Sequence, residues 1–191
     1  MEYFDVFDKD LRKLDKVMER GTSLNKGEYH KVVQIWIKNS NKYLIQQRNK
    51  REDRVPYQWA LTSGAVLQGE EPLDSIIRET KEEIGLELQK DEIKNISTYF
   101  VNHHKSSFIM YVYFVEKDVK IEDLVIDKQE VKDVKYSSVR EVKQMIRRDE
   151  FWNYPEQFEA PNYFKVLEKE WLYESFIHWR RCWIKRYGSI T

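Results

Sequence analysis

The sequence predicts a domain of the α/β (α+β) class, in which short strands alternate with helices. Segments rich in β-branched and aromatic residues recur along much of the chain, and polar turn residues bound them. Between residues 72 and 84 the apolar positions change to helical spacing. At 191 residues the chain suffices for one domain with a substantial core, with or without an appendage.

Strands are expected at residues 3–7, 32–37, 43–47, 59–62, 96–101, 108–115 and 134–136. The turn Asn39-Ser40-Asn41 separates the second and third of these by hairpin distance, so they are expected to pair. The segment 108–115 is almost unbroken in apolar residues, which is typical of a central strand. Residues 11–20 fit either a strand or a helix.

Two helices have recognisable ends. Pro72 suits the first turn of a helix, and Gly85 suits the position just after its end. Ser138 and Glu141 form a capping signature for a second helix that runs to about Arg147. From residue 151 onward aromatic residues keep roughly helical spacing, which predicts a long terminal helix. We therefore expect a domain at residues 1–150 and a C-terminal helical extension at residues 151–191.

Composition and charge indicate where the protein works. Acidic and basic residues balance at 33 each, so nothing favours steering toward nucleic acid or an anionic membrane. The single cysteine, Cys182, cannot form an internal disulfide, which indicates a reducing compartment. The first residues do not form a signal peptide, and no stretch approaches the roughly 20 apolar residues of a membrane span. We expect a cytoplasmic protein without a membrane or nucleic-acid partner.

Three glutamates share one face of the first predicted helix. Glu79, Glu82 and Glu83 stand at positions i, i+3 and i+4, where like charges repel. A hard divalent cation would offset this repulsion, and an all-oxygen ligand set suits Mg²⁺ or Mn²⁺. Arg78 can reach Glu82 or fold back on Glu70, which would hold the ligands in place. The cluster therefore predicts a metal site, whereas most charged helix faces are simply solvated.

A longer pattern surrounds these glutamates. Residues 64–86 match G-x5-E-x7-R-E-U-x-E-E-x-G-U at all seven fixed letters, a coincidence with a chance probability on the order of 10⁻⁶ in such a chain. The pattern resembles the Nudix box, the signature of the Nudix (MutT-like) hydrolases. Thr80 departs from it, because the family usually has an aliphatic residue there.

The resemblance implies a sandwich of helices around a mixed sheet, and hydrolysis of a nucleoside diphosphate linked to another group. Carried over by position, it makes Glu79, Glu82, Glu83 and the backbone carbonyl of Ser63 ligands of Mg²⁺. The general base would be a glutamate of the box or one from a later loop, where Glu130 stands. Arg78 would support the catalytic glutamates.

Two other functions fit parts of the sequence. Residues 1–90 also resemble the isopentenyl diphosphate isomerase branch of the superfamily, in segments such as Leu44-Ile45-Gln46-Gln47-Arg48. That isomerase uses a cysteine just before the helix, where this chain has Thr62 and Ser63, so the isomerase alternative is disfavoured. A binding or regulatory module without catalysis is the second alternative, but a pure binder has no need of clustered like charges.

Other polar residues are candidates for substrate contacts. Arg48 begins a basic loop upstream of the box and is a candidate phosphate ligand, as is His104 in the loop between two predicted strands. His30 could touch the site or serve a structural role. The aromatic residues of 151–191 either form a lid or pack against the domain or a second copy in a homodimer, and helical spacing favours packing.

Overall fold

The computed structural model describes residues 1–49, 56–102, 107–152, 164 and 167. Residues Met1–Tyr154 form one compact unit and Pro155–Thr191 a second. The predicted terminal helix lies almost entirely outside the described residues, so the division at residue 150 stays a prediction. All that follows concerns the first unit.

The elements of this unit follow one another as β1 (Tyr3–Phe7), β2 (Lys13–Glu19), β3 (His30–Asn39), β4 (Lys42–Arg48), β5 (Trp59–Ala60), β6 (Thr62–Ala65), α1 (Pro72–Ile84), η1 (Lys90–Glu92), β7 (Lys94–Val101), β8 (Phe108–Glu116), η2 (Ile121–Asp123), β9 (Val131–Ser137) and α2 (Val139–Arg147). The η elements are single 3₁₀ turns. Among the helices described, none is long and apolar enough to cross a membrane.

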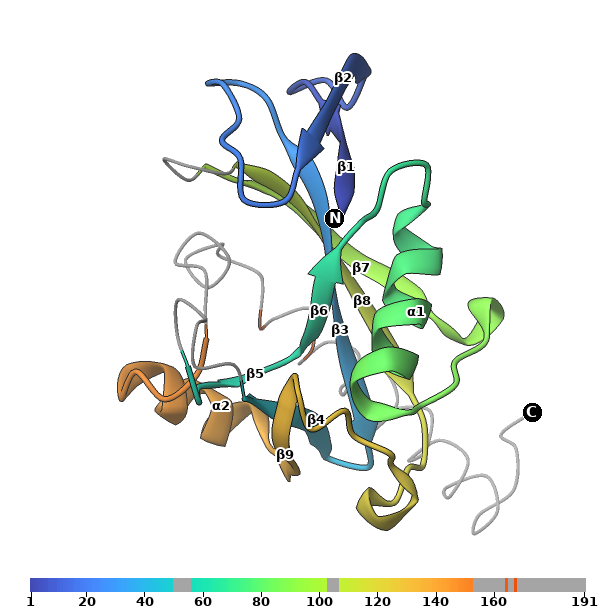
Figure 1. The fold of residues 1–191 in the computed structure, drawn as a ribbon. Helices are drawn as coiled ribbons and strands as arrows, with labels where there is room; N and C mark the ends of the chain where they lie inside the picture. The colour runs from blue at the N-terminus through green and yellow to red at the C-terminus, as the bar shows by residue number, and fades with distance from the viewer. Residues whose placement is uncertain (50–55, 103–106, 153–163, 165–166, 168–191) are drawn as a thin grey trace, which may run out of the picture. The chain divides into compact units, whose positions relative to one another are not determined.

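A seven-stranded mixed sheet forms the body of the unit (Figure 1). Its path runs β5-β4-β3-β8-β7, while β6 pairs with β3 and β9 pairs with β4. Among the strands that the structure describes in this sheet, β3 and β8 pair in parallel and the other pairs are antiparallel. The α+β expectation is therefore confirmed, and β8 lies inside the sheet between β3 and β7, as its apolar sequence predicted.

One predicted strand proved to be two. Residues 59–62 were expected to form a single strand, but β5 pairs with β4 whereas β6 pairs with β3. The hairpin partners β3 and β4 pair beside their turn, where Ile37, Lys38 and Asn39 lie opposite Leu44, Tyr43 and Lys42. Between β5 and β6 the chain therefore crosses from β4 to β3. Leu61, the residue at this crossing, is fully buried. This passage brings β6 alongside α1 (Figure 1).

The segment whose structure the sequence left open, residues 11–20, contains β2. It pairs with β1 in a two-stranded sheet apart from the main one. The Asp5 carboxylate accepts a hydrogen bond from the Gly69 amide (3.0 Å) and forms an ion pair with Lys13 (2.9 Å). The hairpin is thus joined to the loop that precedes α1.

Helix α1 has the ends that its sequence predicted. Pro72 is its first residue, and Gly85 follows it in the left-handed conformation with φ of 69°. A side chain at Gly85 would also meet Val125, whose carbonyl oxygen would lie 2.8 Å from the added Cβ. The loop after η2 therefore packs against the end of the helix. Its amides at Val125 and Asp127 donate to the carbonyls of Ile84 (3.2 Å) and Glu83 (3.0 Å).

Helix α1 is anchored by its apolar face. Ile76 and Ile84 are fully buried and pack with Val33, Ile35 and Tyr113 of the sheet. Burial of such side chains stabilises the fold by roughly 1.5–3 kcal/mol each. The second helix, α2, begins as predicted with Ser138 and Glu141 in a reciprocal capping box.

His30 is a structural residue of the core. Only 7% of it is exposed, and its ring stacks on Phe4 at 5.4 Å between centroids and lies 5.9 Å from the Phe108 ring. Burial lowers the pKa of His30 to about 4, a backbone hydrogen bond at Lys31 opposes the shift, and the charge of Arg20 adds to it. Folded protein therefore keeps this imidazole neutral well below pH 6.

The contribution of His30 to stability is expected to fall in acid. In the unfolded chain its pKa returns to about 6.5, so between pH 6.5 and 4 the unfolded state binds more protons at this residue. Between pH 7 and pH 5 this should cost about 2 kcal/mol, against the raised pKa values of Glu79 and Glu83, which favour the folded state in the same range. Urea unfolding of wild type and His30→Gln at several pH values isolates the effect, because the variant should gain about 2 kcal/mol relative to wild type between pH 7 and pH 5. A constant difference between the two proteins across this window would refute the assignment.

Candidate active site

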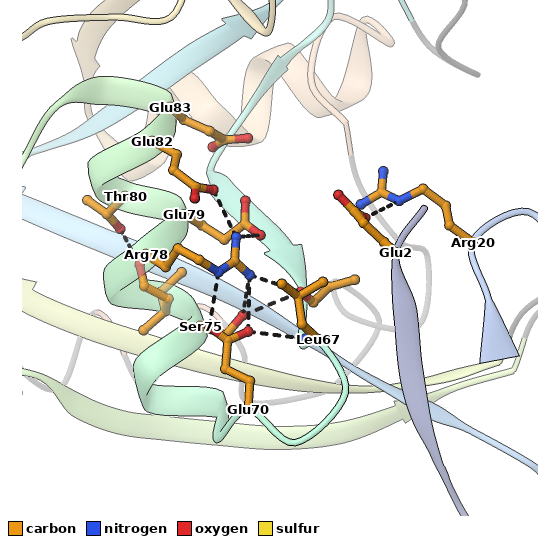
Figure 2. A network of polar contacts seen from close by, with 12 residues as sticks. Glu2, Arg20, Leu67, Glu70, Ser75, Arg78, Glu79, Thr80, Glu82 and Glu83 are labelled. Carbon is orange, nitrogen blue, oxygen red and sulfur yellow. Dashed lines mark hydrogen bonds and ion pairs between the residues drawn. The ribbon is translucent and has the colours of Figure 1, made fainter. Parts of the chain in front are cut away.

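The three glutamates of α1 lie along one side of the helix, facing β6 (Figure 2). They differ in environment. The Glu82 side chain is 59% exposed, whereas Glu83 is 7% exposed and the Glu79 side chain is mostly buried. The spacing predicted that the three share a face, and the fold decides that two of them are withdrawn from water.

Arg78 joins the glutamates to the loop before the helix (Figure 2). Its Nη1 lies 2.8 Å from Glu79 and donates to Glu82 at 2.9 Å. Its Nε and Nη2 donate to the two carboxylate oxygens of Glu70 at 3.0 and 3.1 Å. Both contacts expected for Arg78, to Glu82 and to Glu70, are therefore present together. Burial lowers the pKa of Arg78, but the bonds to Glu70 and the charge of Glu79 outweigh it, so the net shift is upward.

Glu70 also organises the loop itself. Its second carboxylate oxygen accepts the Leu67 amide at 3.1 Å while it receives Arg78. Gly69 in the same loop adopts a φ of 77°, a conformation that glycine tolerates best. Glu70, a fixed residue of the pattern, therefore holds both Arg78 and the loop before α1.

Glu79 lies directly against β6. A Cβ added to Gly64 would overlap the carboxyl group of Glu79 and stand 2.5 Å from its Cγ. Gly64 does not have a positive φ, so the glycine is required by space and not by backbone conformation. Gly64, the first fixed residue of the pattern, therefore leaves the space that the Glu79 side chain occupies.

Glu83 is held from the opposite side of the site by a residue that no motif named. The Gln46 amide on β4 donates to Glu83 at 2.7 Å, and the Thr62 hydroxyl on β6 donates to Gln46 at 3.0 Å. All three side chains are buried. In the sequence, Gln46 is a polar residue within a predicted strand and part of the segment that resembles the isomerase branch, and neither feature gave it a role at the site.

The crowded carboxyl groups hold protons unusually tightly. Burial raises the pKa of Glu79 to about 7, with Arg78 opposing and the charges of Glu82 and Glu130 adding to the rise. Burial likewise raises the pKa of Glu83 to about 8, with the Gln46 hydrogen bond opposing it. Carboxyl groups tuned this far cluster at functional sites.

Glu130 and Arg48 also belong to this neighbourhood. The charge of Glu130 raises the pKa of both Glu79 and Glu83, and the charge of Arg48 lowers that of Glu83. The Asn49 amide, next to Arg48, donates to the Glu130 carbonyl at 2.9 Å. The structure thus brings the later-loop glutamate and the strand arginine toward the helix, although the sequence separates them widely.

The remaining predicted site residues have different positions. Ser63 lies on β6 beside Gly64, opposite Gln34 of β3. His104 and the basic residues 50–54 lie outside the described residues. The roles given to Ser63 and His104 therefore stay predictions.

The donor set suits a hard cation. Glu79, Glu82 and Glu83 offer only oxygen, the ligand that Mg²⁺ and Mn²⁺ prefer. As the described side chains stand, no three acidic, histidine or cysteine residues among them converge closely enough to hold an ion. Glu79 and Glu82 point to the Arg78 guanidinium instead.

Comparisons with known proteins agree with this geometry. A family model described as the NUDIX domain matches residues 28–158. An uncharacterized Nudix hydrolase of Listeria innocua, lin0387, is 32% identical over 156 residues, which are 81% of this chain and 90% of that protein. These matches define an enzyme that hydrolyses pyrophosphate bonds. The chain belongs to the NUDIX family.

Solved structures share the fold. The crystal structure of DR0079 from Deinococcus radiodurans superposes with a TM-score of 0.66 at 17% identity, covering 87% of this chain and 98% of that chain. The NUDIX domain of Shewanella oneidensis NrtR, solved with ADP ribose, gives a TM-score of 0.50 at 18% identity, covering 59% and 75%. At these identities the likeness shows the common architecture alone.

Proposed function

We propose that the protein is a Mg²⁺-dependent pyrophosphohydrolase that cleaves the phosphoanhydride bond of a nucleoside diphosphate linked to another group. The observation that carries the proposal is the buried cluster of Glu79 and Glu83 beside the exposed Glu82, held by Arg78. Like charges in a desolvated site cost stability, and binding a divalent cation would offset that cost.

In this proposal Glu79, Glu82 and Glu83 bind Mg²⁺ or Mn²⁺, together with the Ser63 carbonyl. The bound cation would supply charge stabilisation on the phosphates and acidify a water. Arg78 and Glu70 keep the glutamates in register. Glu130 or Glu83 accepts the proton of the attacking water, because Glu130 lies close enough for its charge to raise the pKa of Glu83.

Arg48 is proposed to contact a substrate phosphate, since its charge already reaches Glu83. A nucleoside diphosphate derivative fits a site that pairs several carboxylates for a cation with a nearby arginine for phosphate. The ADP ribose in the NrtR complex supports this substrate class. A cytoplasmic location completes the proposal, in which residues 151–191 form a lid, pack against the domain or join two copies in a homodimer.

A substrate panel tests it directly. The full-length protein is incubated with ADP ribose, nucleotide sugars, dinucleoside polyphosphates and nucleoside triphosphates, and products are separated by anion-exchange chromatography. We expect turnover with Mg²⁺ that is lost with EDTA and restored by excess Mg²⁺. Persistent failure across the panel, or turnover that EDTA does not affect, contradicts the proposal.

A further inference from the structure

A short chain of hydrogen bonds connects three elements behind the glutamate cluster. Thr62 on β6 donates to Gln46 on β4, and Gln46 donates to Glu83 on α1. Gln46, which bonds Glu83, and Thr62, which bonds Gln46, lie outside residues 64–86, so the family pattern does not include them. Their burial sets them apart from ordinary surface amides and hydroxyls.

The direction of each bond matters. An amide side chain keeps its shape when its ends are exchanged, so neighbouring groups decide which end faces which partner. With Nε2 toward Glu83, the amide nitrogen meets a carboxylate and the amide oxygen meets the Thr62 hydroxyl. Exchanging the ends would place the amide oxygen against the Glu83 carboxylate, which in its charged, cation-binding form is also an acceptor and would repel it.

We propose that Gln46 is a positioning residue for hydrolysis, which holds the Glu83 carboxylate in one orientation before the cation binds, and that Thr62 fixes the orientation of Gln46. The inference rests on the proposed function, because it gives Glu83 a metal-binding role. Groups that orient a metal ligand through a hydrogen bond commonly change metal affinity or activity 10–100-fold when removed.

Because these hydrogen bonds are buried, loss of the Thr62 hydroxyl should affect the Glu83 carboxylate. If Thr62 loses its hydroxyl, the Gln46 carbonyl oxygen is left without that donor inside the protein, which disfavours the orientation that serves Glu83. Glu83 is then free to change its rotamer. Metal binding must in that case order the carboxylate as well as bind the ion, so affinity falls.

The test uses Thr62→Val, Gln46→Met and the double variant, with Thr62→Ser as the conservative rescue. Thr80→Val is the matched control, because Thr80 is also buried but its hydroxyl bonds the Ile76 carbonyl within α1 (2.7 Å). Isothermal titration calorimetry measures Mg²⁺ binding without substrate. Steady-state kinetics give kcat and KM, and thermal unfolding monitors folding.

We expect Thr62→Val to weaken Mg²⁺ binding and lower kcat by about tenfold each, and Gln46→Met to do so by about 10–100-fold, with KM changing less than threefold. The double variant should match Gln46→Met, because Thr62 acts through Gln46. Thr62→Ser and Thr80→Val should stay within about twofold of wild type in both readouts.

The inference is overturned if folded Gln46→Met keeps wild-type Mg²⁺ affinity and kcat. It is also overturned if Thr62→Val weakens Mg²⁺ binding as much in the Gln46→Met background as in wild type. If Gln46→Met does not fold, Thr62→Val and its serine rescue decide. A wild type that neither binds Mg²⁺ nor hydrolyses the panel overturns the proposed function as well, so the two failures are distinguishable.

Discussion

Replacing Glu83 with glutamine is expected to remove most of the hydrolysis while making the protein more stable. Glutamine has the same shape but no charge, so the site loses one carboxylate for the cation. We expect kcat to fall roughly 10³-fold, which corresponds to about 4 kcal/mol of transition-state stabilisation. Glutamine can still accept the Gln46 amide through its oxygen, so the packing around residue 83 is retained.

The gain in stability follows from the raised pKa. Glu83 has a folded pKa of about 8, above its unfolded value, so wild type loses stability as the pH rises from the unfolded value toward 8. Glu83→Gln abolishes that loss, which should raise the free energy of unfolding by roughly 2–3 kcal/mol at pH 7 without metal. Urea unfolding in EDTA measures this gain, which should disappear below pH 4.5.

Glu87→Gln is the matched control for this pair of opposite effects. Glu87 follows the same helix, but it is exposed and ion-pairs with Lys81 at 2.8 Å. It should change neither kcat nor stability appreciably. Full activity in Glu83→Gln would exclude Glu83 from the chemistry. A loss of stability in that variant would show that burial does not destabilise the charged form.

Gly64→Ala should disable the site without unfolding the protein. The added methyl group overlaps the carboxyl group of Glu79, which is the far end of a flexible side chain and can swing aside. The backbone of Gly64 is accessible to alanine, so the strand is not strained. We expect the thermal midpoint to move by no more than a few degrees while kcat falls about 10²-fold, because a metal ligand is displaced.

Two measurements distinguish this mechanism from a general loss of structure. Mg²⁺ titration should show weaker binding in Gly64→Ala. In a Glu79→Gln background, where the first ligand is already lost, Gly64→Ala should cause little further loss of affinity. If Gly64→Ala retains wild-type turnover, or loses activity only in proportion to unfolding, the role assigned to Gly64, which is to leave room for the Glu79 side chain, is wrong.

Local features of the fold were predictable because their causes lie within a few residues. The ends of α1 follow from Pro72 and Gly85, and the start of α2 follows from Ser138 and Glu141, since caps act over one turn. The shared face of the glutamates and the contact between Arg78 and Glu82 follow from helical spacing in the same way.

Features that depend on distant pairing were not predictable. Residues 13–19 form a strand because β1 offers a partner, whereas their own composition suits either strand or helix. The division of residues 59–65 into β5 and β6 arises because β3 and β4 separate, and nothing near Leu61 marks that event. Pairing across a sheet depends on tertiary context more than on the residues of one strand.

The sequence alone determined the Nudix pattern, the metal-binding chemistry it implies and the helix that carries it, because each depends on the order and spacing of neighbouring residues. Only the tertiary structure decided that Glu83 is buried and Glu79 mostly buried while Glu82 is exposed. It also decided that Gln46, 37 residues before Glu83, holds the Glu83 carboxylate. Burial and hydrogen-bond partners are set by elements brought together from distant parts of the chain. For this reason the raised pKa values of Glu79 and Glu83 follow from the folded structure and not from the sequence.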